Sequence, residues 1–164
     1  MIIGGPGSGK STLARVLAEK PGLPVTDIDQ LQFRFGWIAI NPAKKQAQVR
    51  DVTAREHWII AGNNSSTAEE RMSRADTLIW LDIPLWRRLW RVAQRTLKSY
   101  GQSRPDLPAG CPKRFLVGFI LHSLSSKKQQ RATAEDRYTA MSQKAQAFHL
   151  RTHRGVEQLL EQLS

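Results

Sequence analysis

The sequence predicts an α/β fold in which helices cover both faces of a parallel β-sheet. Short apolar runs bounded by turn-forming residues alternate with longer helical stretches along most of the chain. Such runs are typical of buried parallel strands, and their alternation with helices is typical of a doubly wound sheet. A glycine-rich turn at residues 4–11, between the first apolar run and the first helical stretch, is the third observation that favours this fold class.

The elements follow in chain order from this alternation. The expected strands are residues 1–3, 25–28, 57–61, 77–83 and 147–150. The expected helices are residues 11–20, 42–56, 67–74, 85–100, 115–123, about 130–145 and 155–163. The first strand has three residues before the turn, whereas a central strand of about five is usual. We therefore expect the natural chain to start a few residues upstream.

The composition is that of one globular domain. The chain has 164 residues, of which 40% are hydrophobic and 24% are charged, so we expect a single domain over residues 1–164. No apolar run approaches the roughly 20 residues of a membrane span, and no signal segment begins the sequence. A cytoplasmic protein without membrane association is expected. The single cysteine, Cys111, is expected to be a small buried residue rather than a nucleophile.

The glycine-rich turn fits the phosphate-binding pattern G-x-x-x-x-G-K-[ST]. A polyphosphate is held by backbone N–H groups that converge on its oxygens, and glycine permits the backbone conformations that this requires. The helix that follows adds free N–H groups and the positive end of its dipole. We expect Lys10 to reach the terminal phosphates of ATP and the Ser11 hydroxyl to bind Mg²⁺. The expected nucleotide-binding residues are Gly4, Gly5, Pro6, Gly7, Ser8, Gly9, Lys10, Ser11 and Thr12.

Polar residues follow several of the expected strands. Ligands bind at the carboxyl ends of the strands in open α/β sheets, so these residues are site candidates. They are Asp27, Asp29, Asn63, Asn64 and Asp82. Asp29 is expected to face the acceptor as a general base. Two interpretations of Asp82 stay open: it binds Mg²⁺, or it fixes the turn before Pro84.

The expected helix over residues 85–100 carries a row of arginines. Arg87, Arg91 and Arg95 are spaced by four residues and so share one helix face. Like charges at this spacing repel one another, which favours an anion opposite them over a merely solvated face. We expect the arginines of residues 88–95 to offset phosphate charge. Trp86 and Trp90 on the same helix are expected to be core residues.

Most of the positive charge lies in one part of the chain. The formal net charge is +11, and residues 87–137 contain twelve Lys or Arg against three Asp or Glu, a net +9. Such a stretch suits an anionic partner. Nucleotide phosphates, nucleic acid and a solvated basic surface all stay open as explanations.

A segment rich in prolines, glycines and basic residues interrupts the alternation at residues 101–114. A loop with so many helix- and strand-breaking residues, placed after a long basic helix, is either a lid over a phosphate site or a disordered excursion. We predict a mobile lid that becomes ordered with nucleotide, on the basis of its prolines, glycines and basic flanks.

Several segments together resemble one known family. They are GGPGSGKSTLAR, residues 28–31 with Gly36 and Trp37, residues 58–64 with Arg71 and residues 75–76, residues 81–84, and residues 104–108 with 110–112. In this order and spacing they resemble the adenylate-kinase-like DNA topology modulation proteins. Family members usually carry aspartate at the position that Ala61 occupies here. The departure puts catalysis, more than nucleotide binding, in question.

The resemblance implies a nucleoside-monophosphate-kinase core with a central five-stranded parallel sheet. It implies ATP as phosphoryl donor, with Arg91 and Arg95 on the donor phosphates. The hypothesis is therefore a kinase for a small acceptor, a nucleotide or another metabolite, with Lys10, Asp29, Arg91 and Arg95 as the catalytic residues. Two alternatives stay open: a nucleic-acid-binding protein regulated by ATP, and a nucleotide sensor without turnover. The sequence does not distinguish a monomer from a dimer.

Overall fold

A computed structural model describes residues 1–19, 22–28, 31, 33–34, 38–98 and 125–162 of the chain. Several sequence expectations lie outside the described residues. They concern Asp29, Cys111, the lid at 101–114 and the helix at 115–123. The side chain of Arg95 also lies outside the described part.

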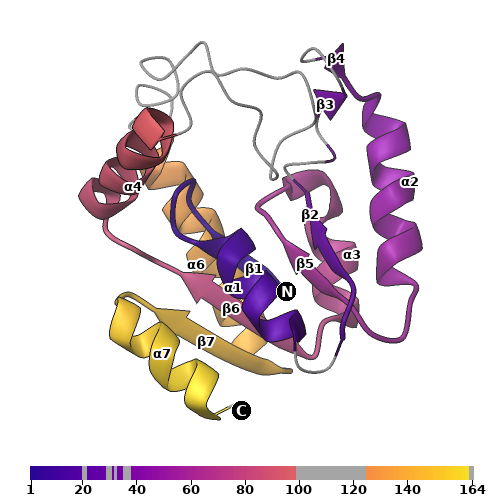
Figure 1. Cartoon of the computed structure of the whole chain (residues 1–164). Coiled ribbons are helices and arrows are strands. Elements are labelled where there is room, and N and C mark those ends of the chain that lie inside the picture. Colours follow the sequence, from indigo (N-terminus) through magenta and orange to yellow (C-terminus); the bar gives the residue numbers. More distant parts are fainter. Residues whose placement is uncertain (20–21, 29–30, 32, 35–37, 99–124, 163–164) are drawn as a thin grey trace.

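A five-stranded parallel sheet forms the centre of the fold (Figure 1). Its strands are β1 (Ile2–Gly4), β2 (Val25–Asp27), β5 (Ile59–Ala61), β6 (Thr77–Leu81) and β7 (Gln146–Leu150). Their spatial order is β2-β5-β1-β6-β7, and all four pairings are parallel. This confirms the predicted fold class and places the strand before the glycine-rich turn at the centre of the sheet.

The helices agree closely with the sequence pattern. They are α1 (Lys10–Glu19), α2 (Pro42–Thr53), α3 (Ala68–Arg74), α4 (Leu85–Lys98), α6 (Lys127–Ser142) and α7 (His153–Gln162). The sequence prediction missed a 3-10 turn, η3 (Ser65–Thr67), and a short antiparallel pair, β3 (Phe33–Arg34) with β4 (Ile38–Ala39). Among the described helices, none is both long and apolar enough to cross a membrane.

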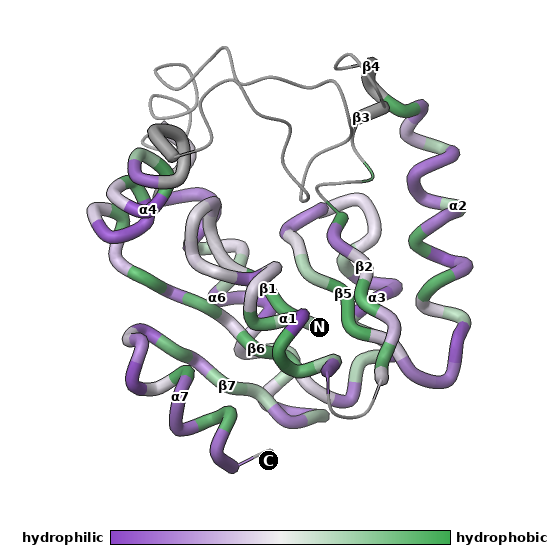
Figure 2. The backbone as a smooth tube through the Cα atoms, in the orientation of Figure 1, coloured by the Kyte–Doolittle hydropathy of each residue, from purple (hydrophilic) through white to green (hydrophobic). Residues whose placement is uncertain are grey.

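Alternate side chains of the sheet build two separate cores, one on each face. On β6, Ile79 and Leu81 belong to a cluster with residues of α1 and α7, whereas Leu78 and Trp80 belong to a cluster with residues of α6. This alternation follows from the two-residue period of a strand. Hydrophobic residues accordingly occur in the central strands, while α2 alternates between hydrophobic and hydrophilic residues (Figure 2). The sheet is therefore rigidly held between two helical layers.

A buried arginine fixes the loop after β5. Arg71 of α3 is fully buried, and its guanidinium donates to three backbone carbonyls, at 3.2 Å to Thr67 O, 3.0 Å to Gly62 O and 2.6 Å to Asn64 O. Burial, with a smaller contribution from nearby Arg137, lowers the pKa of Arg71 to about 10, so it stays protonated at neutral pH. One side chain thus ties residues 62–67 into a single compact turn.

We predict that Arg71→Lys lowers the free energy of unfolding by about 3 kcal/mol. A lysine ammonium cannot span carbonyls that Arg71 bonds through three different nitrogens, and each lost bond from a charged donor costs roughly 1.5–3 kcal/mol. Urea unfolding of the variant measures the loss. Arg74→Lys on the same helix is the matched control, because Arg74 is exposed and makes one 3.3 Å bond to Ala54 O. Equal losses in the two variants would contradict this role for Arg71.

Candidate functional site

The phosphate-binding pattern forms a tight loop between β1 and α1. Ser8 N donates to Gly5 O at 3.1 Å, and Leu13 N donates to Gly9 O at 2.9 Å. The helix begins at Lys10, so its first free N–H groups belong to the loop itself. The loop lies at the carboxyl end of the central strand, where open α/β sheets bind their ligands (Figure 1).

Two of the loop glycines lie against α4, Gly5 against a side chain and Gly7 against the helix backbone. A Cβ on Gly5 would collide with the guanidinium of Arg88. A Cβ on Gly7, whose φ is +77°, would lie 2.7 Å from Arg88 O and 2.9 Å from Val92 Cγ2. The α4 backbone therefore approaches the loop more closely than a larger residue at position 7 would allow.

Lys10 and Ser11 lie at the base of the loop. The Lys10 side chain is only 8% exposed, and Nζ donates to Gly5 O at 3.3 Å, so the ammonium folds back across the loop. Ser11 Oγ donates to Asp27 Oδ2 at the end of β2. Of the other predicted binding residues, Pro6 and Gly9 are half-buried and Thr12 is exposed. The loop thus carries a cation inside it and a hydroxyl–carboxylate pair beside it.

Asn63 holds the end of β1 from the neighbouring loop. Its Oδ1 accepts from Gly4 N at 3.0 Å and its Nδ2 donates to Gly4 O at 2.9 Å, as a strand neighbour would. Asn64 has a local role, since its Oδ1 accepts from Ser66 N at 2.8 Å and caps η3. Both asparagines were site candidates by position, and the structure shows them bonded within the protein, Asn63 directly to the phosphate loop.

The arginines of α4 do not act as the single row that their spacing suggested. Arg88 is 9% exposed and lies across Gly5, and Arg91 Nη1 lies 3.7 Å from the position of a Cβ on Gly9. Arg87 is exposed, with its guanidinium carbon 5.0 Å from the centre of the Trp86 ring. Arg88, not Arg87, therefore shares the loop-facing side of α4 with Arg91.

The prediction that the two tryptophans of α4 are core residues is wrong. Trp86 is 66% exposed and Trp90 is 62% exposed. The inner face of the helix is formed instead by Arg88 and Val92, which contact the phosphate loop. Helical periodicity places Trp86 and Trp90 on one stripe, but it does not say which stripe faces inward.

Asp82 lies where two arginines and a histidine meet. Its Oδ2 is 3.1 Å from His149 Nε2, 3.3 Å from Arg131 Nη2 and 3.5 Å from Arg151 Nε. The His149 ring stacks on Trp80, with the ring centres 3.9 Å apart and the planes 3° from parallel. Asp82 thus joins β6, β7 and α6 at the carboxyl edge of the sheet. Among the described residues, no group of three or more His, Cys, Asp or Glu side chains is placed to hold a metal ion.

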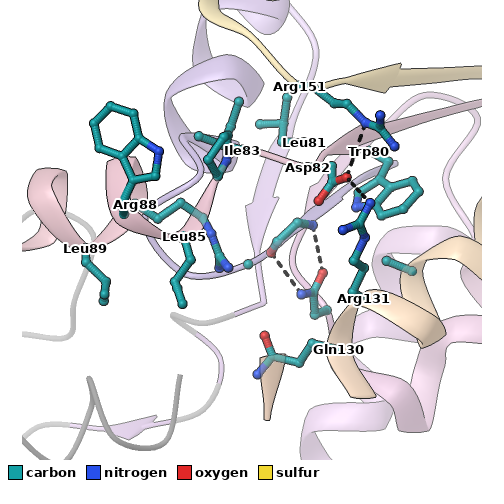
Figure 3. Close-up of a pocket in the computed structure, with 16 residues that line it drawn as sticks. Trp80, Leu81, Asp82, Ile83, Leu85, Arg88, Leu89, Gln130, Arg131 and Arg151 are labelled. Carbon is teal, nitrogen blue, oxygen red and sulfur yellow. Dashed lines mark hydrogen bonds and ion pairs between the residues drawn. The ribbon is translucent and has the colours of Figure 1, made fainter. Parts of the chain in front are cut away.

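A pocket of about 630 Å³ opens beside the loop (Figure 3). Its floor includes Gly4, Gly5 and Asn63, and its walls come from the β6–α4 connection and from the first turns of α6. The volume is in the range of small-molecule sites. The pocket therefore brings a ligand-sized space against the turn that the sequence predicts to bind phosphate.

Several residues of this region gave no sequence signal. Asp27 was one candidate among several, and nothing in the sequence paired it with Ser11. Arg131 and His149 come from elements far along the chain, and only the topology brings them to Asp82. The only available signal was general: residues 147–150 were expected to be a strand, but its place beside β6 is known from the structure.

Comparison with solved structures shows that the chain has the fold of the P-loop kinases. A shikimate kinase from Acinetobacter baumannii, solved with shikimate, matches with a TM-score of 0.56 and 16% identity, over 99% of this chain and 88% of that one. A sugar kinase from Janibacter sp. HTCC2649 matches with a TM-score of 0.52 and 18% identity, over 98% and 88%. A gluconokinase from Sinorhizobium meliloti 1021 matches with a TM-score of 0.51 and 14% identity, over 99% and 93%.

One particular curated relative shares recognisable sequence. It is the uncharacterized protein YqaC of Bacillus subtilis (strain 168), 30% identical over 104 residues, which are 61% of this chain. The chain spans 57% of the length of that relative. No protein-family model matches the chain. At the identities of the solved kinases, the likeness concerns the fold and does not transfer an acceptor.

We predict that Gly7→Ala destabilises the protein more than Gly22→Ala does. Both glycines have positive φ, at +77° and +64°, which costs alanine about 1 kcal/mol or more. No heavy atom of the described residues lies within 4 Å of a Cβ on Gly22, whereas a Cβ on Gly7 meets α4. Overpacking adds about 1–3 kcal/mol. Urea unfolding measures the free energy of unfolding of the two variants. Equal losses would show that the packing of α4 does not require glycine at position 7.

Proposed function

We propose that this chain is a phosphotransferase that passes the γ-phosphoryl group of ATP to a small-molecule acceptor. The observation that carries the proposal is the buried Lys10 inside a phosphate loop whose edge, Gly4 and Gly5, also forms the floor of a ligand-sized pocket. Donor and acceptor sites that share a boundary are what direct transfer requires, because the reacting atoms must be held a few ångströms apart. The P-loop kinase fold supports the same proposal.

The loop fits a polyphosphate on its own geometry. Ser8 Oγ is buried at 3% exposure and has no hydrogen-bond partner among the described residues, so it is a free polar group within the loop. ATP would supply the phosphoryl group, and Mg²⁺ would offset charge on its phosphates. Residues 4–12 would hold the donor through their backbone N–H groups. Lys10 would exchange its bond to Gly5 O for the terminal phosphates.

The geometry favours Asp27 over Asp82 as the carboxylate nearest a magnesium ion. Asp27 accepts from Ser11, the residue whose hydroxyl the pattern assigns to Mg²⁺. Asp82 is instead engaged by Arg131, His149 and Arg151. Mg²⁺ keeps several waters and accepts one or two carboxylates, so Ser11 with Asp27 makes a sufficient protein share of its shell.

The arginines and the acceptor base complete the proposal. Arg91 faces the loop, and with Arg95 it would offset charge that develops on the transferred group. Asp29 would take the proton of the acceptor hydroxyl, two residues beyond β2. The lid at residues 101–114, a single domain over residues 1–164, a cytoplasmic location and kinship with the DNA topology modulation proteins stay predictions.

The nucleic-acid alternative loses part of its electrostatic basis. Of the cations in the basic stretch 87–137, Arg88 is buried, Arg131 pairs with Asp82, and Arg137 donates to Asn63 O at 3.4 Å and to Ser65 Oγ at 3.3 Å. Arg88 and Arg137 are thus engaged within the protein, whereas Arg131 is paired but remains half-exposed. Titrating a short duplex at several salt concentrations tests the alternative, because phosphate-driven binding weakens steeply as salt rises.

We predict that Lys10→Ala lowers ATP affinity at least 100-fold and leaves the free energy of unfolding nearly unchanged. Lys10 Nζ donates to the loop carbonyl of Gly5, and in the complex it would turn to the phosphates. Each charge-assisted bond to phosphate is worth roughly 1.5–3 kcal/mol, and Lys10 would make more than one. Equilibrium binding of labelled ATP measures the effect, with Lys44→Ala on the exposed surface of α2 as control.

Unchanged ATP affinity in a folded Lys10→Ala variant would contradict nucleotide binding at this loop. Turnover is tested separately with labelled ATP and a panel of nucleosides, nucleotides and small metabolites as acceptors. Tight binding with no product from any acceptor would favour the non-catalytic nucleotide sensor.

A further inference from the structure

The pocket beside the phosphate loop has an unbalanced charge. Among its described lining residues are three arginines, Arg88, Arg131 and Arg151, and a single carboxylate, Asp82. Asp82 Oδ2 already lies within 3.5 Å of Arg131, Arg151 and His149. The three arginines are therefore balanced by only one carboxylate among the described lining residues, and the pocket keeps a net positive charge.

Arg88 is the cation with the greatest need of a counterion. It is 9% exposed, its Nε has no hydrogen-bond partner among the described residues, and it lines the pocket. Burial lowers the pKa of Arg88, and the more distant charge of Asp82 offsets this only in part. A buried charge without a paired partner is costly, so a group that supplies the missing acceptor gains a strong interaction.

Most of the remaining pocket lining is apolar. It includes Leu81, Ile83, Leu85, Leu89 and Ala134. Arg88 extends from α4 on one side of the pocket and Arg131 extends from α6 on the other (Figure 3). A ligand that fits this lining has an acid group at one end and an apolar body at the other.

We propose that this pocket is the acceptor site and that it takes a small organic acid, whose carboxylate or phosphate group binds Arg88 and Arg131. The inference rests on the proposed function, because it assigns the acceptor of that same transfer. Guanidinium groups bind planar oxyanions through paired N–H bonds, which orients the ligand as well as holding it. The apolar wall orients the body of the acid and leaves its hydroxyl facing the phosphate loop.

Arg131 is suited to this role because it can keep or exchange its partner. Its side chain is 51% exposed and contacts Asp82 at 3.3 Å, a pairing that contributes little when half-solvated. If Arg131 turns to an incoming acid group, Asp82 does not lose all of its partners, because His149 and Arg151 contact the same carboxylate oxygen. The arrangement holds Arg131 at the pocket edge before the acid arrives.

Three probes of similar size test the proposal. Benzoate and phenyl phosphate carry the two kinds of acid group on the same apolar ring, and benzyl alcohol is the neutral control. Titration calorimetry measures each probe on the full chain, with and without saturating Mg²⁺ and a non-hydrolysable ATP analogue. We expect at least one acid to bind about tenfold or more tighter than the alcohol, the factor that one charge-assisted hydrogen bond supplies.

The variants Arg88→Gln and Arg131→Gln should each weaken that acid about tenfold or more and leave the alcohol unchanged. Arg87→Gln removes an equal charge from α4 outside the pocket and should change neither probe. If Arg88→Gln fails to fold, Arg131→Gln carries the test, because its half-exposed side chain tolerates replacement.

The outcomes separate this inference from the proposed function. The acid-binding site is contradicted if neither acid binds tighter than the alcohol. It is also contradicted if the Arg88→Gln and Arg131→Gln variants bind the acid as tightly as the parent protein. If the nucleotide analogue still binds in that case, the phosphotransferase proposal stands with another acceptor. If the analogue does not bind, the proposed function fails, and the titrations without nucleotide still decide whether the pocket takes acids.

Discussion

The position of the phosphate loop depends on the pair of hydrogen bonds between the Asn63 amide and the backbone of Gly4. β1 ends at Gly4, which is in register with Leu81 of β6 on one side, whereas β5 on the other side already ends at Ala61. Asn63 bonds to Gly4 from the neighbouring loop, which Arg71 in turn holds through three carbonyls. Arg71 of α3 thus stabilises the phosphate loop indirectly: it holds the segment around Asn63, and Asn63 holds Gly4.

Excess positive charge is a second constraint that shapes the site. Arg71 is satisfied by carbonyls, Arg131 shares Asp82, and Arg88 has a buried Nε without a partner in the described part of the chain. Of the three, Arg88 lies against Gly5 of the loop and has the least compensation. An anion bound at the loop would therefore supply charge where the protein itself supplies least.

Local patterns in the sequence were enough to predict the five strands of the central sheet, most helices and the glycine-rich loop. Each of these depends on residues that are close in the chain. Helix-face assignments were less secure: Trp86 and Trp90 were expected inside and Arg87 was grouped with Arg91, because periodicity defines stripes but not which stripe is buried. The grouping of Asp82 with Arg131 and His149 needed the sheet order, which brings β6 beside β7. Contacts that depend on topology leave no local signal.

The fully buried Ala61 explains how the chain can lack the aspartate expected there. Its methyl group packs in the core with Leu13 and Ala14 of α1, and it lies in register beside Asp27 of β2. Register partners in a parallel pair project to the same face, so aspartate at position 61 would set two carboxylates next to each other near Ser11.

Without a bound cation such a pair of carboxylates is costly, since one carboxylate must stay protonated. Alanine removes that cost, and Asp27 alone keeps the hydroxyl of Ser11 oriented. The Ser11–Asp27 pair is therefore held by one hydrogen bond beside a neutral, buried Ala61.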